Sequence, residues 1–128
     1  MEFNDSNKAI YLQIADAIAD DVVMHRLRPD ERIPSVREYA ARVMVNVNTV
    51  MRSYDHLSSL GVIYNKRGLG FFVAPDGAGR VKALRRSRLI DDGGLDQFFR
   101  QLQLLDVSPA ELAQMYTQYL NKQSLNNQ

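Results

Sequence analysis

Basic side chains gather in the middle of the chain, where they form a candidate site for an anionic polymer. Residues 32–78 hold six lysines and arginines against three acidic residues, a net charge of +3, whereas the whole chain carries only +1. Residues 1–31 carry a net charge of −4. A local positive field can attract nucleic acid even when the whole molecule is almost neutral. The charge distribution therefore makes nucleic acid a candidate partner, with an ordinary solvated surface as the alternative.

The other reactive residue types do not form a pattern typical of catalysis. The chain has no cysteine, which excludes a disulfide, a cysteine nucleophile and a thiolate metal site. His25 and His56 are its two histidines, and neither belongs to a catalytic motif. Asp20-Asp21 and Asp91-Asp92 are isolated acidic pairs, and Gly68-Leu69-Gly70 lacks the helix start of a phosphate-binding loop. We therefore expect no enzyme activity, no metal and no cofactor.

Length and composition are those of a small globular protein. The 128 residues are 45% hydrophobic and 24% charged, enough for one domain or one domain with a small appendage. No apolar run reaches the roughly 18–20 residues of a membrane span. The first residues also lack the apolar stretch of a signal peptide. We expect a cytoplasmic protein that does not associate with a membrane.

Residues 36–60 have the pattern of a helix-turn-helix. Ser35 and Glu38 have the spacing of a capping box, which predicts a short helix over 36–43. Asn46 is the next candidate N-cap, and it predicts a second helix that ends near Leu60, before a glycine. Two short helices joined by a tight turn are typical of this motif.

A β-hairpin is predicted directly after these helices. Residues 62–64 and 71–73 are strand-like, and the segment between them is typical of a turn. Lys66 and Arg67 are placed at the tip of this hairpin. The ordered combination of caps, helices, glycine and a hairpin with a basic tip predicts a winged helix-turn-helix.

Helices are also predicted on both sides of this motif. Apolar spacing predicts a core-facing helix from Tyr11 to near Leu27. Residues 75–79 read as a hinge, and the polar tail 121–128 is expected to fray. The C-terminal helices are predicted over 80–90, 95–105 and 109–121, with a break at the glycine pair 93–94.

From Arg32 to Ala74 the sequence resembles the DNA-binding domain of the GntR family of bacterial transcription regulators. The matching motifs are Pro34-Ser35-Val36-Arg37-Glu38, Asn48-Thr49-Val50-Met51-Arg52-Ser53-Tyr54, Leu60-Gly61-Val62-Ile63 and Arg67-Gly68-Leu69-Gly70-Phe71-Phe72-Val73. The upstream segment Tyr11-Leu12-Gln13-Ile14 also fits the family, so the similarity covers roughly residues 8–75. The 50 or so residues that follow resemble the short C-terminal part of YtrA-type members. The resemblance implies a mainly α fold with a small β-hairpin. It places a winged helix-turn-helix DNA-binding domain over 1–76 and a two-helix dimerisation segment over 77–128.

The resemblance also implies which residues bind double-stranded DNA. The helix that begins after Asn46 is expected to enter the major groove, where asparagine pairs with adenine and arginine with guanine, and where Val47 and Met51 can meet thymine methyl groups. Arg37 is expected to contact a phosphate or a guanine, and the wing is expected to reach the minor groove or a phosphate. The predicted contacts are Arg37, Asn46, Val47, Asn48, Thr49, Met51, Arg52, Lys66, Arg67 and Gly68.

Each of these assignments has a structural alternative. Asn46 is expected to cap its helix whether or not it contacts a base. Arg52 is either a DNA contact or part of a solvated face, and the wing is either a DNA contact or an ordinary charged turn. Arg37 has an ion pair with Glu38 or Asp55 as its alternative.

Few basic groups per subunit predict weak binding by one domain, so a homodimer on an inverted-repeat operator is expected. The expected interface is Leu95, Phe98, Phe99, Leu102, Met115 and Tyr119, with an intramolecular core as the alternative role. The resemblance favours a repressor, with a transporter operon as its target. A small-molecule effector stays open, and a winged-helix module that binds a protein partner is the alternative function.

Overall fold

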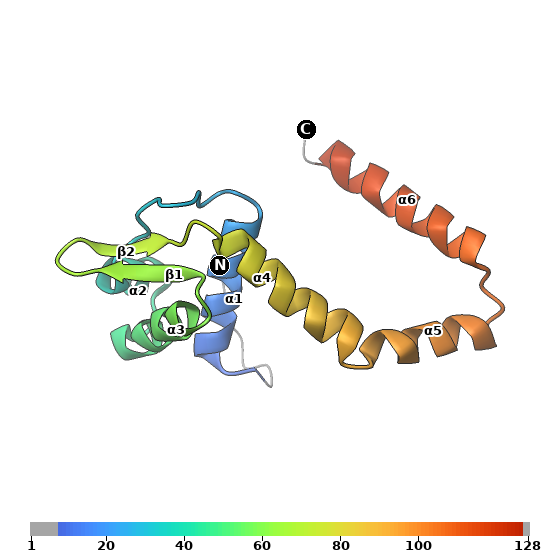
Figure 1. The fold of residues 1–128 in the computed structure, drawn as a ribbon, viewed down its shortest axis with the longest axis horizontal. Coiled ribbons are helices and arrows are strands. Elements are labelled where there is room, and N and C mark those ends of the chain that lie inside the picture. The colour runs from blue at the N-terminus through green and yellow to red at the C-terminus, as the bar shows by residue number, and fades with distance from the viewer. Residues whose placement is uncertain (1–7, 127–128) are drawn as a thin grey trace. The chain divides into compact units, whose positions relative to one another are not determined.

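The computed structural model describes residues 8–126, and the chain divides into two compact units after Arg85 (Figure 1). The described residues are mainly helical with one two-stranded antiparallel hairpin, as predicted. The first unit contains α1 (Ile10–Val23), α2 (Val36–Val43), α3 (Val47–Ser59), β1 (Ile63–Lys66), β2 (Gly70–Val73) and most of α4 (Gly77–Arg86). The second contains a π-helical turn, η1 (Ser87–Asp91), followed by α5 (Gly94–Leu104) and α6 (Pro109–Asn126).

The core of the first unit lies where α1 crosses α3. Both helices place an apolar stripe inward at helical spacing, and the hairpin closes the core from the side. Its fully buried members are Ile14, Val22, Ile33, Val50, Tyr54, Leu57, Val62, Ile63 and Val73. The predicted end of α1 near Leu27 is wrong, because His25 has a left-handed φ of 59° that turns the chain out of the helix after Val23.

Local capping sets the limits of α2 and α3. The Ser35 hydroxyl accepts the Glu38 backbone N–H at 3.1 Å, and the Glu38 carboxylate accepts the Ser35 backbone N–H at 3.4 Å. This confirms the predicted capping box. Met44 ends α2 in a left-handed conformation (φ 57°), and Asn46 caps α3 two residues later. The turn between the two helices is therefore tight.

The hairpin is longer than predicted and has a third segment beside it. Its register pairs Ile63 with Val73 and Lys66 with Gly70, so the strands reach closer to the turn than residues 62–64 and 71–73. The chain just before α2 runs along the outer edge of β2. The Ile33 N–H donates to the Phe71 carbonyl at 3.0 Å, with further backbone bonds from the neighbouring residues. The wing is thus tied to the segment that leads into α2.

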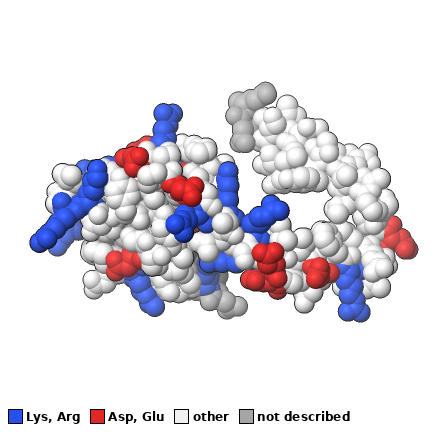
Figure 2. Space-filling model, in the orientation of Figure 1, with Lys and Arg blue, Asp and Glu red and all other residues white. Residues whose placement is uncertain are grey.

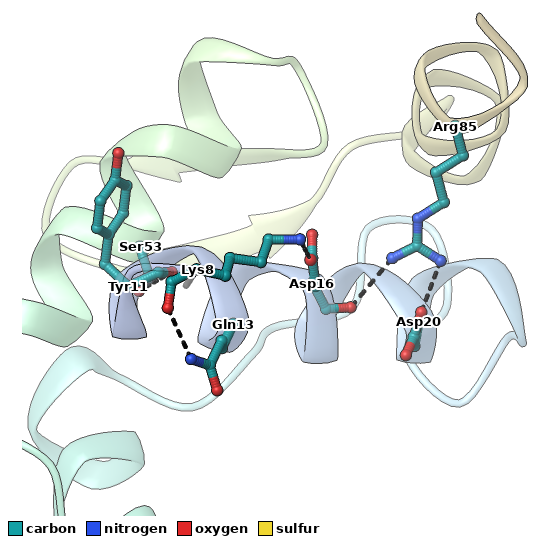
Figure 3. Close-up of polar contacts among 7 residues, drawn as sticks. All are labelled: Lys8, Tyr11, Gln13, Asp16, Asp20, Ser53 and Arg85. Atoms are coloured by element: carbon teal, nitrogen blue, oxygen red, sulfur yellow. Dashed lines mark hydrogen bonds and ion pairs between the residues drawn. The ribbon is translucent and has the colours of Figure 1, made fainter. Parts of the chain in front are cut away.

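The predicted hinge over residues 75–79 is wrong, because α4 already begins at Gly77. Gly77 is buried, and a Cβ at this position would lie 2.8 Å from the Val62 carbonyl oxygen. The glycine therefore serves close packing rather than flexibility. Arg85 binds α1 from the other end of α4, through the Asp20 carboxylate at 2.6 Å and the Asp16 carbonyl at 3.2 Å (Figure 3).

The second unit consists of the π-helical turn and two helices joined by a short loop, with little core of its own. Gly93 has a φ of 86° and separates η1 from α5, as the glycine pair predicted. The helix predicted over 80–90 is divided into the end of α4 and the π-helical turn. The polar tail is helical through Asn126, so the predicted fraying from residue 121 is not seen, and residues 127–128 lie outside the described part. Neither α5 nor α6 contains a buried residue.

Candidate nucleic-acid interface

Exposed polar side chains at the beginning of α3 form the first part of the site. The Asn46 Oδ1 accepts the Asn48 backbone N–H at 2.7 Å, which confirms the capping role expected for Asn46. The Asn46 amide NH₂ makes no hydrogen bond within residues 8–126 and remains available as a donor. Val50, Ser53 and Tyr54 face the core. The residues that face solvent are Asn46, Val47, Asn48, Met51 and Arg52, with Thr49 half-buried between them.

Arg52 does not simply extend into solvent. Its guanidinium carbon lies 3.9 Å from the centroid of the Tyr11 ring, on the first turn of α1. The sequence predicted Tyr11 as a core residue, but it is half-buried and carries this arginine on its ring face. An aromatic residue near an arginine in space gives no signal in a single sequence when it lies 41 positions away.

Arg37 is exposed in the first turn of α2 and is unpaired within the described part of the chain. Its predicted alternative, an ion pair with Glu38 or Asp55, is therefore not formed there. The Ser35 hydroxyl and then the Ser35 backbone N–H hold the pKa of Glu38 below its usual value. Because the Glu38 carboxylate accepts the Ser35 backbone N–H and does not bind Arg37, the N–H donors of the Arg37 guanidinium stay available for a ligand.

Lys66 and Arg67 lie at the far end of the wing. Lys66 ends β1, and its Nζ lies 5.2 Å from the centroid of the Phe72 ring. Arg67 and Gly68 are exposed in the turn, where the Leu69 N–H donates to the Lys66 carbonyl at 2.9 Å. Gly68 has a φ of 79° and open space around its Cα, so the backbone there can approach a ligand closely. Figure 2 shows basic side chains projecting from the end of the first unit that carries this turn.

One buried tyrosine holds α2, α3 and the wing in a fixed arrangement. The Tyr54 hydroxyl donates to the Pro34 carbonyl at 2.6 Å, just before α2. Its ring packs edge-on against Phe71 of β2, with the centroids 5.1 Å apart. Burial, with a smaller contribution from neighbouring Tyr39, raises the pKa of Tyr54 far above its usual value, so it is a neutral donor at physiological pH. The three elements that carry the exposed donors thus share one anchor.

The chemistry of this surface is hydrogen-bond donation to an acceptor-rich, anionic partner. Arginine and lysine donors suit phosphate and guanine, and asparagine suits adenine. Within residues 8–126 no group of three acidic, histidine or cysteine side chains is placed to hold a metal ion. In the same range no helix combines the length and apolarity that crossing a membrane requires.

The predicted dimerisation residues lie on the surface of the second unit. Phe98, Phe99, Met115 and Tyr119 are 49%, 46%, 44% and 57% exposed, and Leu95 and Leu102 are half-buried. Such exposure of large apolar side chains is unusual for a surface that stays in water. A shallow groove between α5 and α6 is lined by Phe99, Leu102, Gln103, Val107, Ser108, Pro109 and Leu112.

Two curated relatives from Bacillus subtilis (strain 168) match the winged region. An uncharacterized HTH-type transcriptional regulator, YhcF, is 46% identical over 69 residues, which is 54% of this chain and 57% of that protein. The HTH-type transcriptional repressor YtrA is 33% identical over 69 residues, or 54% of this chain and 53% of that protein. The matched region thus spans a little over half the length of each relative.

Solved structures match both the fold and the winged region. A putative GntR-family transcriptional regulator from Bacteroides thetaiotaomicron is 48% identical, with a TM-score of 0.72 over 90% of this chain and 99% of that chain. The AraR DNA-binding domain in complex with operator ORX1 is 25% identical, with a TM-score of 0.53 over 58% of this chain and 93% of that chain.

These relatives are transcription regulators, not enzymes, which agrees with the lack of a catalytic pattern in the sequence. The family model described as "Bacterial regulatory proteins, gntR family" matches residues 10–73, which run from the start of α1 to the end of β2. The chain therefore belongs to the GntR family of bacterial transcription regulators, as the sequence motifs predicted.

Proposed function

We propose that this protein is a repressor that binds an inverted-repeat operator as a homodimer. The observation that carries the proposal is a set of exposed, uncommitted donors on three elements that share one buried anchor. They are Arg37 on α2, the beginning of α3 with Arg52, and the wing with Arg67. A regulator needs such fixed donors because base edges are read by hydrogen bonds of defined geometry.

We assign reading of bases to α3 and binding of phosphates to α2 and the wing. Asn48, Thr49 and Arg52 reach base edges in the major groove, together with the free amide of Asn46. Val47 and Met51 are 42% and 41% exposed, which suits contact with thymine methyl groups. Arg37, Lys66 and Arg67 contact the backbone, and Gly68 lets the wing approach it closely.

Homodimer formation through the second unit is the next part of the proposal. The exposed apolar side chains of α5 and α6 support it, because no other part of that unit buries them. Two linked domains bind two half-sites far more tightly than one, which compensates for few basic groups per subunit. A two-fold dimer then requires an inverted repeat. We accordingly assign residues 1–76 to DNA binding and 77–128 to dimerisation, with the beginning of the second segment, through Arg85, packed into the first unit.

The regulatory role rests on the relatives. YtrA is named a repressor and the AraR domain is bound to an operator, which supports repression at an operator here. We propose a transporter operon as the target, by likeness to short YtrA-type members, and the cytoplasm as the location, since the chromosome is there. A small-molecule effector is the remaining partner to be sought.

The test is the double variant Arg37→Ala/Arg67→Ala on operator DNA. Both side chains are exposed and unpaired in the described structure, so their loss leaves the fold intact. We expect a protein with unchanged circular dichroism and gel-filtration volume that no longer binds the duplex at physiological salt. Unchanged DNA binding would overturn the proposal and favour a winged-helix module that binds a protein partner.

A further inference from the structure

We infer that Tyr11, outside the helix-turn-helix, is a positioning residue that fixes Arg52 for reading one base pair of the operator. The inference deepens the proposed function and rests on it. Its basis is the stacking of the Arg52 guanidinium on the Tyr11 ring, with 3.9 Å between the guanidinium carbon and the ring centroid. At this distance the ring quadrupole attracts the cation and restricts its position.

Tyr11 is itself held in place by α3. The Ser53 hydroxyl, fully buried between the two helices, donates to the Tyr11 carbonyl at 2.8 Å (Figure 3). The His56 ring meets the Tyr11 ring edge-on, with the centroids 6.0 Å apart and an interplanar angle of 88°. The aromatic platform is therefore fixed to the helix that carries Arg52.

Stacking leaves the donors of Arg52 unused. The N–H groups of a guanidinium lie in its plane, so contact through its face does not consume them. Within residues 8–126 Arg52 makes no hydrogen bond or ion pair. Arg85 is the contrast, because its amino groups are bonded to α1 (Figure 3). Arg85 therefore has a structural role, whereas Arg52 is held in place with its donors free.

The ring and the arginine share a surface with the base-reading end of α3. A shallow depression there is lined by Ala9, Ile10, Tyr11, Asn48, Thr49 and Arg52. Tyr11 thus lies on the side of the domain where the predicted base contacts lie, although it belongs to another helix. An arginine loses considerable side-chain freedom when it pairs with guanine, and a stacked arginine has already lost part of it.

The expected consequence is a loss of discrimination at one base pair without a general loss of binding. Removing the ring leaves the charge of Arg52 in place, so attraction to phosphates persists. The cation–π contact corresponds to about a two- to five-fold change in preference for the base pair that Arg52 reads. Tyr11→Phe retains the ring face and serves as the matched control for Tyr11→Leu.

The experiment uses the full chain and a random duplex pool. Selection with the wild type and with Arg52→Ala identifies the base pair whose preference depends on Arg52. Dissociation constants are then measured on the selected duplex and on one with that pair replaced, for Tyr11→Phe, Tyr11→Leu, Arg52→Ala and the double variant Tyr11→Leu/Arg52→Ala. The discrimination ratio is the dissociation constant on the duplex with the replaced pair divided by that on the selected duplex. We expect Tyr11→Leu to lower this ratio about two- to five-fold and Tyr11→Phe to leave it unchanged. The double variant should have the same ratio as Arg52→Ala.

Equal weakening of both duplexes by Tyr11→Leu, or a further effect in the Arg52→Ala background, would assign Tyr11 a merely structural role and overturn the inference. If Arg52→Ala relaxes no base pair, the assigned role of Arg52 fails and the inference fails with it. In that case, loss of DNA binding by the variant Arg37→Ala/Arg67→Ala would still support the proposed function. If Tyr11→Leu does not fold, the stacking is tested in the wild type by NMR. Ring-current shifts of the Arg52 side-chain protons would support the stacking, and unshifted protons would contradict it.

Discussion

Replacing Arg67 with alanine tests whether the wing binds the DNA backbone. Arg67 is exposed in the turn between β1 and β2, so the substitution removes a charge and little packing. Each phosphate contact contributes about 0.9 to the slope of log K against log salt concentration. A dimer loses two such contacts, so its slope becomes shallower by about 1.8.

This change in slope has a measurable size. Between 50 and 200 mM salt, a slope difference of about 1.8 alters the ratio of mutant to wild-type dissociation constants by about 12-fold. The substitution therefore weakens binding most at low salt and least at high salt. Fluorescence anisotropy with a labelled operator duplex, repeated over a salt series, measures both slopes.

Arg26→Ala is the matched control, since Arg26 lies in the same unit but is paired with Asp21 at 3.0 Å. We expect its slope to equal that of the wild type. An unchanged slope for Arg67→Ala would refute the backbone contact. A loss seen only on duplexes with an A·T-rich flank would instead place the wing in the minor groove.

Three further predictions concern the fold that positions the site. Gly77→Ala forces a Cβ to 2.8 Å from a backbone oxygen and should lower the free energy of unfolding by about 1–3 kcal/mol. At Gly79 the nearest atom to an added Cβ belongs to a carboxylate that can move, so Gly79→Ala should be neutral or stabilising. Urea denaturation of both variants measures the difference. Tyr54→Phe removes a 2.6 Å hydrogen bond to the Pro34 carbonyl and should lower the same free energy by about 1 kcal/mol. Because the pKa of Glu38 is lowered in the folded state, its contribution is complete above the ordinary carboxyl pKa and is lost as pH falls through the lowered value. The urea midpoints of the wild type and Glu38→Gln should therefore converge on acidification, and a constant difference would contradict this reasoning.

The elements that were predicted correctly are those fixed by local chemistry. The capping box of Ser35 and Glu38 predicted the start of α2, and the Asn46 cap predicted the start of α3. Gly61 ends α3 with a φ of 76°, where its position after Leu60 suggested a left-handed residue. Each of these signals lies within a few residues of its effect, so one sequence is enough to read it.

The features that were not predicted depend on contacts between distant segments. The sequence predicted Gly77 as part of a hinge, but this position requires glycine because the Val62 carbonyl oxygen leaves no space for a Cβ. Tyr11 fitted the apolar spacing of its helix, and only the packing of α1 on α3 shows that its ring carries Arg52. Contacts of this kind between distant segments leave no periodic pattern in a single sequence.

The most direct test of the account is a binding selection from a random duplex DNA pool at about 150 mM salt, where the sequence-independent phosphate contribution is suppressed. We expect one enriched motif, an inverted repeat, because a two-fold dimer presents α3 to two half-sites. A folded, dimeric protein that enriches no motif, with and without metabolites from a cell extract, would contradict the claim that this surface reads an operator.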